Sequence, residues 1–213
     1  MIPLTFQGFK SSDFDTFTIQ GLDPRMDAIK ENVRPKLMEI GQEIEPVLTT
    51  IGGEPFYFHV AKHARRTVNP PNDTWVAWAT NKRGYKMLPH FQVGLWSTHL
   101  FIWFAIIYES PNKYVFADKA LNKLHDLMKQ IPEEFVWSTD HTVPDVHKHS
   151  DLSINDLQQM LERLREVKKS EILCGITLNR NNPIVYDGDL LLKKVADTFK
   201  TLFPLYLLAQ SSS

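Results

Sequence analysis

The sequence predicts an α+β protein: a mainly antiparallel sheet from the central part of the chain, packed by helices from both ends. Strand-like segments cluster between residues 56 and 108, helical patterns precede and follow them, and the sequence shows no regular βαβ alternation. With 213 residues, 43% of them hydrophobic, the chain can bury a core without a metal or disulfide. No composition break divides it, so we predict one domain over 1–213 with a frayed tail at 210–213.

A long amphipathic helix is the first predicted element. It starts with Asp23 as N-cap and Pro24 in the first turn, and it ends at Gly52-Gly53. Its apolar stripe has steps of three or four residues: Met26, Ile29, Val33, Leu37, Ile40, Ile44 and Val47. Pro35 removes one internal hydrogen bond, so we expect a kink or a split there.

Four strands are predicted in the middle of the chain, at 56–61, 73–80, 90–96 and 99–108. Only Ser97-Thr98 is available as a turn between the last two, which therefore form an antiparallel hairpin. The last strand is apolar on both faces and should be central in the sheet.

The second half of the chain predicts two helices, a strand and a C-terminal helix. Their ranges are 114–131, 154–167, 171–178 and 192–206. Ser153 and Asp156 resemble a capping box at the start of the second of these helices, and Pro204 should kink or break the last.

Charge is distributed unevenly along the chain. The formal net charge of −1 excludes a generally basic nucleic-acid-binding protein, yet the segment 59–90 carries +5 and the remainder −6. The basic residues of the segment form two clusters that flank the predicted strand 73–80: Lys62, Arg65, Arg66 and Lys82, Arg83, Lys86. The chain either leaves the clusters at opposite ends of this strand or loops them back together.

Two interpretations of the basic segment remain open on composition. In one it forms a cleft for phosphate or carboxylate, because arginine offers a planar fork, lysine a mobile charge, and Gly84 close backbone approach. In the other it is a solvated surface, with Arg65 and Arg66 paired to acids elsewhere. Composition alone slightly favours the solvated surface. No nucleic-acid-binding motif accompanies the charge.

Histidines suggest acid–base chemistry more than metal binding. His59 and His63 lie four residues apart in a strand-like context without the glutamate of a zinc motif, and with His90 they are candidate acid/base groups. The alternative is that His59 is a sheet residue and His63 contacts the anion.

A second histidine group has a metal-like composition because aspartates lie close to it: Asp140, His141, Asp145, His147 and His149. We interpret its segment as an exposed loop and expect neither a dedicated metal site nor a cofactor, although adventitious Zn or Ni binding by these histidines stays open.

Other catalytic and targeting signals are weak. Cys174 lies in a strand pattern typical of a buried structural cysteine, and the phosphate-loop, dinucleotide and serine-nucleophile motifs are absent from the sequence. Trp75 or Trp78 could line a pocket. The start Met1–Leu4 has no signal-peptide pattern, and the longest apolar run, 100–107, is far shorter than a membrane span. We therefore expect a cytoplasmic protein without a membrane partner.

Several motifs resemble the YktB-like family of bacterial proteins. They are His59–Pro71, Asp73–Ala77, Lys82–Lys86, Leu88–Gln92, Phe14-Asp-x-Phe17, Gly21-Leu22, Arg34–Leu37, Asp140-His141 and Pro144-Asp145. The resemblance covers essentially the whole chain and implies a single cytoplasmic α+β domain, with no catalytic residues to transfer. Because the shared motif at 59–92 is polar and basic, the resemblance moves the anion cleft ahead of the solvated surface.

The sequence thus predicts a binding domain for a small anionic or phosphate-bearing ligand. The predicted ligand-binding residues are Lys62, His63, Arg65, Arg66, Lys82, Arg83, Tyr85, Lys86 and Gln92, with His59 and His90 on the floor. One alternative is a hydrolase or transferase for a phosphorylated substrate, with His59, His63 or His90 as acid/base. Another is a nucleic-acid or protein interaction module that uses the same patch. No oligomeric state is predicted.

Overall fold

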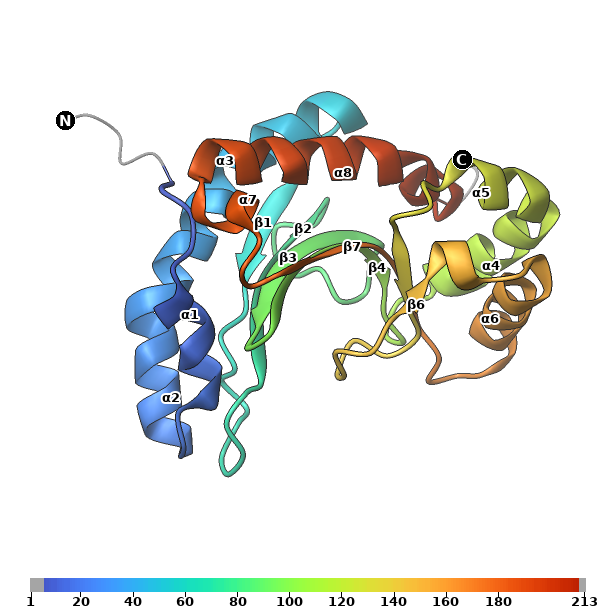
Figure 1. Ribbon diagram of the computed structural model, residues 1–213. Helices are drawn as coiled ribbons and strands as arrows, with labels where there is room; N and C mark the ends of the chain where they lie inside the picture. Colours follow the sequence, from blue (N-terminus) through green and yellow to red (C-terminus); the bar gives the residue numbers. More distant parts are fainter. Residues whose placement is uncertain (1–5, 211–213) are drawn as a thin grey trace.

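One sheet of seven antiparallel strands organises residues 6–210, which a computed structural model describes (Figure 1). The strands in spatial order are β1 (Tyr57–Val60), β2 (Asp73–Ala79), β3 (His90–Trp96), β4 (His99–Ile106), β7 (Ile172–Asn179), β5 (Val136–Ser138) and β6 (His147–Lys148). β4 lies between β3 and β7 and is almost completely buried, which confirms its predicted central place.

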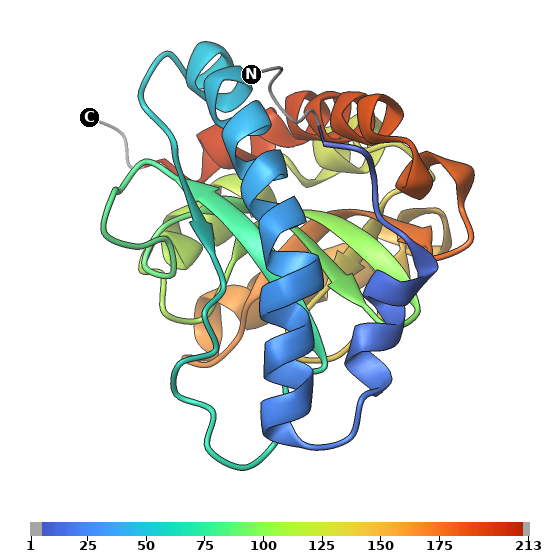
Figure 2. The same ribbon diagram turned by 90° about the vertical axis from the view of Figure 1, so that its left-hand side faces the viewer.

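Helices cover one face of this sheet. They are α1 (Ser11–Asp15), α2 (Leu22–Ala28), α3 (Arg34–Gly52), α4 (Asn112–Asn122), α5 (Leu124–Gln130), α6 (Ile154–Glu166), α7 (Pro183–Tyr186) and α8 (Gly188–Leu208). α3 contacts β1 and β2, whereas α8 contacts β3, β4 and β7. Figure 1 shows α8 crossing the sheet on this side, and Figure 2 shows α3 running its full length along the outside of the molecule. The α+β prediction is confirmed.

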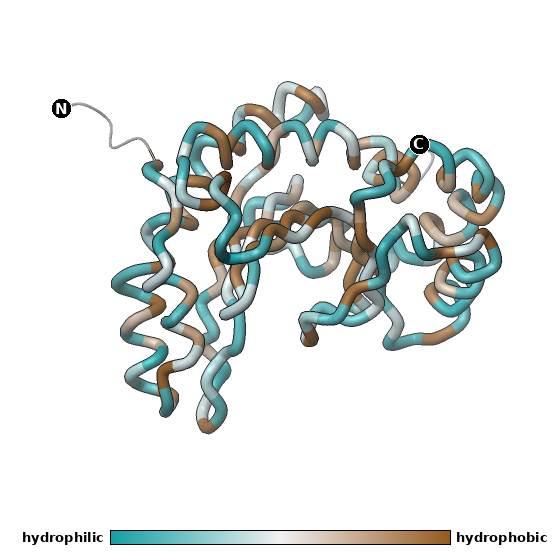
Figure 3. The backbone as a smooth tube through the Cα atoms, in the orientation of Figure 1, coloured by the Kyte–Doolittle hydropathy of each residue, from teal (hydrophilic) through white to brown (hydrophobic). Residues whose placement is uncertain are grey.

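The two faces of the sheet hold different side chains because strand residues alternate. Val76, Trp78, Phe91 and Ile102 belong to the main core beneath the helices. A smaller apolar cluster lies on the other face: Trp96, Phe101, Trp103, Ala105, Val136 and Leu173, with Trp75 and Val146 against it. Figure 3 shows the hydrophobic stretches concentrated along the strands, with hydrophilic stretches in the loops beyond them. We call the side without helices the open face.

Several predicted boundaries are confirmed. β3 and β4 form the expected hairpin around Ser97-Thr98, and Ser153 caps α6 by accepting a hydrogen bond from the Asp156 amide (3.2 Å). α3 ends where Gly53 adopts a left-handed φ of 68°. Near Pro35 the expected irregularity is a π-helical turn at Ile29–Val33, directly before α3.

Other predictions are wrong in detail. α2 starts at Leu22, and Gly21, with a left-handed φ of 88°, is its N-cap. Asp23 therefore lies inside the helix and is not the N-cap. The helix predicted over 114–131 is two helices, because Lys123 leaves the helical region. α8 continues through Pro204 without a break.

Two parts of the sequence-based reading concern the chain ends. The start Met1–Leu4 lies outside the described residues, and so does the predicted frayed tail, apart from Gln210. Between residues 6 and 210, no helix combines the length and the apolar character that crossing a bilayer requires.

Candidate functional site

An open cleft of about 630 Å³ lies between the two basic segments. One segment, 61–66, follows β1, and the other, 83–86, follows β2. Seven of the nine predicted ligand-binding residues line the cleft: Lys62, His63, Arg65, Arg66, Arg83, Tyr85 and Lys86. The chain therefore loops the two basic clusters back together instead of leaving them at opposite ends of β2.

Contacts of Trp75 and Tyr85 hold the two segments together. β1 ends beside β2, where the amide of Ala61 donates to the Trp75 carbonyl (2.9 Å). The segment after β2 folds back until the Tyr85 hydroxyl accepts a hydrogen bond from the Trp75 indole (2.8 Å). The Tyr85 ring also packs against His59 and His90, with ring centroids 5.7 and 4.9 Å apart. Trp75 thus contacts both sides of the cleft.

Most of the positive charge in the cleft has no acidic partner in the described part of the chain. Five cationic side chains and one carboxylate line it, and that carboxylate, Glu109, lies 3.7 Å from the Lys86 ammonium. Among residues 6–210, no carboxylate oxygen comes within ion-pair distance of the other four: Lys62, Arg65, Arg66 and Arg83. The pairing of Arg65 and Arg66 with acids elsewhere, which the solvated-surface alternative requires, is not found.

His63 is the one histidine of the cleft lining. Its backbone adopts a left-handed φ of 52°, which is strained for a residue with a side chain. Its Nε2 lies 3.0 Å from the Thr74 hydroxyl, and its ring meets Trp75 edge-on. Burial, together with the charges of Arg66 and Arg34, lowers the pKa of His63 to about 4. The imidazole is therefore neutral at pH 7.

Tyr85 adds a hydrogen-bond donor to the cleft. Burial raises the pKa of its phenol to about 12, so the hydroxyl keeps its proton at neutral pH. Because the oxygen already accepts from the Trp75 indole, the hydroxyl proton can be donated to a ligand.

Four predicted site residues do not line the cleft. Lys82 is exposed on the same loop as Arg83, and His59 has its Nε2 3.0 Å from the Asn81 carbonyl. His90 is completely buried: Nδ1 donates to the Leu88 carbonyl (2.7 Å) and Nε2 accepts from the Gln92 amide (2.8 Å). Gln92 lines a neighbouring hollow instead of the cleft. Of the three candidate acid/base histidines, the structure brings only His63 to the cleft.

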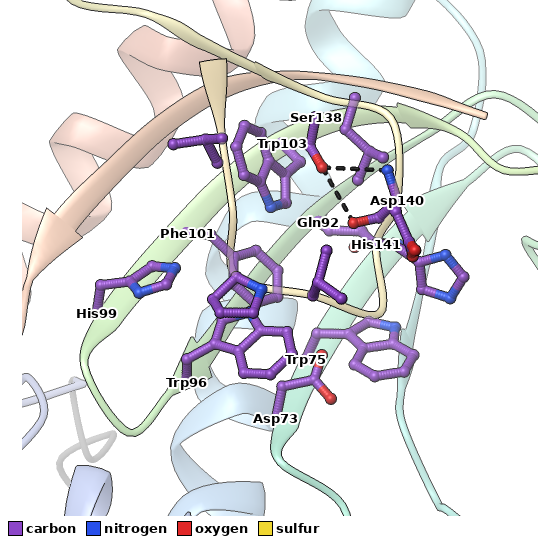
Figure 4. Close-up of a pocket in the computed structure, with 14 residues that line it drawn as sticks. Asp73, Trp75, Gln92, Trp96, His99, Phe101, Trp103, Ser138, Asp140 and His141 are labelled. Atoms are coloured by element: carbon purple, nitrogen blue, oxygen red, sulfur yellow. Dashed lines mark hydrogen bonds between the residues drawn. The ribbon is translucent and has the colours of Figure 1, made fainter. Parts of the chain in front are cut away.

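The neighbouring hollow lies on the open face of the sheet and was not predicted (Figure 4). Its volume is about 20 Å³, enough for a single water-sized group. Its lining combines aromatic side chains with polar ones, among them Trp75, Trp96, Phe101, Trp103, Asp73, Gln92, Asp140 and His141. Trp75 lines both this hollow and the basic cleft, so the two are adjacent.

Asp73 is the ionisable group that the sequence reading missed here. Burial raises the pKa of Asp73 to about 7, while His141 and Arg66 act in the opposite direction. The sequence contained one signal for it, because Asp73 is the only acid between His59 and His90.

His141 lies near Asp73 but comes from a distant segment. Its Nδ1 and its backbone amide both donate to Glu171 Oε1, at 2.7 and 2.6 Å. No sequence signal linked His141 to Glu171, which directly precedes β7.

The loop predicted around His141, His147 and His149 is only partly exposed. His147 is exposed as expected, whereas the prediction is wrong for His149. The His149 ring is buried, and both of its nitrogens have hydrogen-bond partners there. Nδ1 accepts from the Trp137 indole (3.1 Å), and Nε2 donates to the Met128 carbonyl (3.2 Å).

The molecule belongs to the α+β class. Helices cover one face of its antiparallel sheet, and a basic cleft lies next to the other face. The chain belongs to the family described as "Domain of unknown function (DUF1054)", which matches residues 9–206. A UPF0637 protein of Bacillus velezensis is 52% identical over 210 residues, covering 99% of this chain and 100% of that relative. A UPF0637 protein of Bacillus cereus is 53% identical over 205 residues, covering 96% and 99%. The predicted membership of the YktB-like family is confirmed.

Proposed function

We propose that this protein binds a small anionic or phosphate-bearing ligand in the cleft between segments 61–66 and 83–86. The observation that carries the proposal is the convergence of four cations that have no carboxylate partner among residues 6–210: Lys62, Arg65, Arg66 and Arg83. Mutual repulsion makes such a cluster costly unless an anion neutralises it. Guanidinium groups bind phosphate or carboxylate through paired hydrogen bonds.

The volume of the cleft supports a small molecule as ligand. About 630 Å³ lies within the range typical of metabolite sites. The Tyr85 hydroxyl and the neutral imidazole of His63 supply uncharged polar contacts beside the cations. We also propose that the protein acts in the cytoplasm, since its one cysteine, Cys174, is buried and unpaired.

A thermal-shift screen of phosphorylated and carboxylated metabolites, followed by calorimetric titration of each hit, tests the proposal. Arg65→Ala and Arg83→Ala should each weaken the affinity about 10-fold to 100-fold, because each removes a charge-assisted hydrogen bond. Lys82→Ala is the matched control: it removes a cation from the same loop that does not line the cleft, and should leave the affinity within about twofold. A hit that binds both arginine variants as well as the wild type contradicts the proposed cleft.

A second candidate function is a hydrolase or transferase for a phosphorylated substrate. It is favoured by His63, the one candidate acid/base histidine in the cleft lining, because a bound anion beside the ring would raise its pKa from about 4 towards the working pH. Turnover of a phosphorylated hit, abolished by His63→Ala while binding persists, would identify an enzyme. Binding without turnover would leave the ligand-binding function.

An interaction module that uses the same patch for nucleic acid is tested by salt. Affinity that falls steeply with salt concentration indicates contacts to many backbone phosphates, whereas a flat response excludes them.

A further inference from the structure

Three metal-ligating side chains converge at the rim of the hollow on the open face. One ligand atom from each of Asp140, His141 and Glu171 lies within 4.8 Å of the other two. Asp140 and His141 line the hollow itself, and Figure 4 shows both residues beside it. Two carboxylates and one imidazole are an oxygen-and-nitrogen donor set suited to divalent first-row transition metals.

Each of these side chains is held in place from behind. Glu171 is 5% exposed, and its two oxygens accept from the His141 amide (2.6 Å) and the Tyr108 amide (3.4 Å). Asp140 Oδ1 accepts from the amide and the hydroxyl of Thr142, at 2.8 and 2.6 Å. In the described part of the chain Asp140 Oδ2 receives no hydrogen bond, so it can face a cation.

The burial of Asp73 is a second, independent observation that points to a cation at the hollow. It is nine-tenths buried and lines the hollow together with Asp140 and His141. The backbone amide of Asp73 bonds its own carboxylate; across residues 6–210 no other residue donates a hydrogen bond to this carboxylate and no cation lies within ion-pair distance of it. A buried carboxylate that only its own amide bonds is costly, and a cation or a cation-bound water would compensate it.

The charges around the cluster leave a negative excess. Asp73, Asp140 and Glu171 surround the single imidazole. Two cations act on this group from outside: Arg66 on Asp73, and Lys113 on Glu171. The Lys113 ammonium donates to backbone carbonyls of residues 167, 168 and 170, which leaves it no direct contact with the cluster.

We propose that Asp140, His141 and Glu171 bind a divalent transition-metal ion, with Zn²⁺, Co²⁺ and Mn²⁺ as the chemical class. Without the ion, the proton on His141 Nδ1 bridges to Glu171 Oε1. On binding, the ion takes the place of this proton, which is released to solvent. A fourth position of the ion faces the hollow, which has room for one water, and Asp73 accepts a hydrogen bond from that water. This replaces the sequence-based expectation of no metal site, which could not foresee Glu171.

The test is titration of the full-length protein, freed of metal by chelation, with Co²⁺ followed by absorption and with Zn²⁺ followed by calorimetry. One equivalent should bind with a dissociation constant in the micromolar range or below. His141→Ala should weaken binding at least tenfold, and so should Asp140→Asn, which alters an exposed residue and preserves the bonds to Thr142. Circular dichroism and thermal melting of both variants report whether they fold.

His147→Ala is the matched control, because His147 is an exposed histidine of the same segment. It should bind as the wild type does. Binding that is lost in His147→Ala and kept in His141→Ala would mean adventitious binding to surface histidine, and it would overturn the site. Absence of binding of both Co²⁺ and Zn²⁺ up to 100-fold excess would also overturn it. Arg65→Ala and Arg83→Ala should keep full metal affinity, so the outcome is separate from that of the anion cleft.

Discussion

The two faces of the sheet are buried to a similar extent but differ in what is buried. On the helix-covered face, Phe91 packs against Phe104, Phe199 and Tyr206, with ring centroids 4.8 to 5.9 Å apart. The open face carries tryptophans together with three polar side chains that are also buried: Asp73, His90 and Gln92. Since packing alone does not require ionisable groups, the presence of Asp73 and His90 on the open face agrees with the sites proposed there.

Glycines shape the open face and are matched to its aromatic rings. A Cβ atom at Gly94 would lie 2.3 Å from the Phe101 ring and 2.7 Å from Trp75 Cβ. A Cβ atom at Gly175 would lie 1.9 Å from the Ile102 carbonyl oxygen and 2.9 Å from the Trp103 ring. The missing side chains let the rings lie across neighbouring strands. The aromatic floor of the hollow is therefore specified by the backbone as well as by the rings.

Matched truncations should separate the two faces most strongly. Phe91→Ala should lower the free energy of unfolding by about 3–5 kcal/mol, because it leaves a cavity between sheet and helices that cannot close. Phe101→Ala should cost about 2 kcal/mol, because the loop over the open face can move inward and water can enter. Urea unfolding measures both. Equal losses would show that the open face is packed as rigidly as the core.

Protonation of His90 on the open face should destabilise the folded protein in acid. Burial lowers the pKa of His90 to about 4, so the unfolded chain binds a proton on this histidine between pH 6.5 and 4 and the folded chain does not. The stability contributed by neutral His90 is complete above pH 6.5 and is lost as the pH falls towards 4. His90→Gln should reduce the loss of unfolding free energy between pH 7.5 and 5 by about 1–2 kcal/mol.

Urea unfolding of both proteins at both pH values checks this expectation. Asp73 titrates in the opposite sense, because burial raises the pKa of its carboxyl to about 7. The difference between wild type and His90→Gln cancels that contribution. Identical pH dependence of the two proteins would contradict the buried neutral state of His90.

Most strands and helices could be predicted because each has a local periodicity of apolar residues in the sequence. The hairpin at Ser97-Thr98 and the helix that ends at Gly53 needed only neighbouring residues. The short strand β5 carries no such pattern, because its three residues are defined by pairing with β7. Lys123 interrupts a helix whose apolar spacing continues across the break, and spacing cannot report a change of backbone angle.

The basic side of the cleft was visible in the sequence, whereas the hollow beside it was not. The clustering of charge located the basic residues. The fold determines which of these residues share a cleft, and it excludes Lys82. His141 and Glu171 meet only because the loop after β5 passes the start of β7. Such a contact depends on strand order, and nothing in local sequence encodes it.

The smallest contrast between the faces concerns a single indole N–H on each. The Trp75 indole donates to the Tyr85 hydroxyl on the open face (2.8 Å), and the Trp78 indole donates to the Gly41 carbonyl beneath the helices (3.1 Å). Trp75→Phe and Trp78→Phe should each lower the unfolding free energy by about 1 kcal/mol, because each leaves a partner without its hydrogen bond. Only Trp75→Phe should weaken anion binding, by a few-fold, because it frees Tyr85 and with it the segment that carries Arg83. Calorimetric titration of both variants decides the point: equal affinities would mean that Trp75 supports the fold without positioning the cleft.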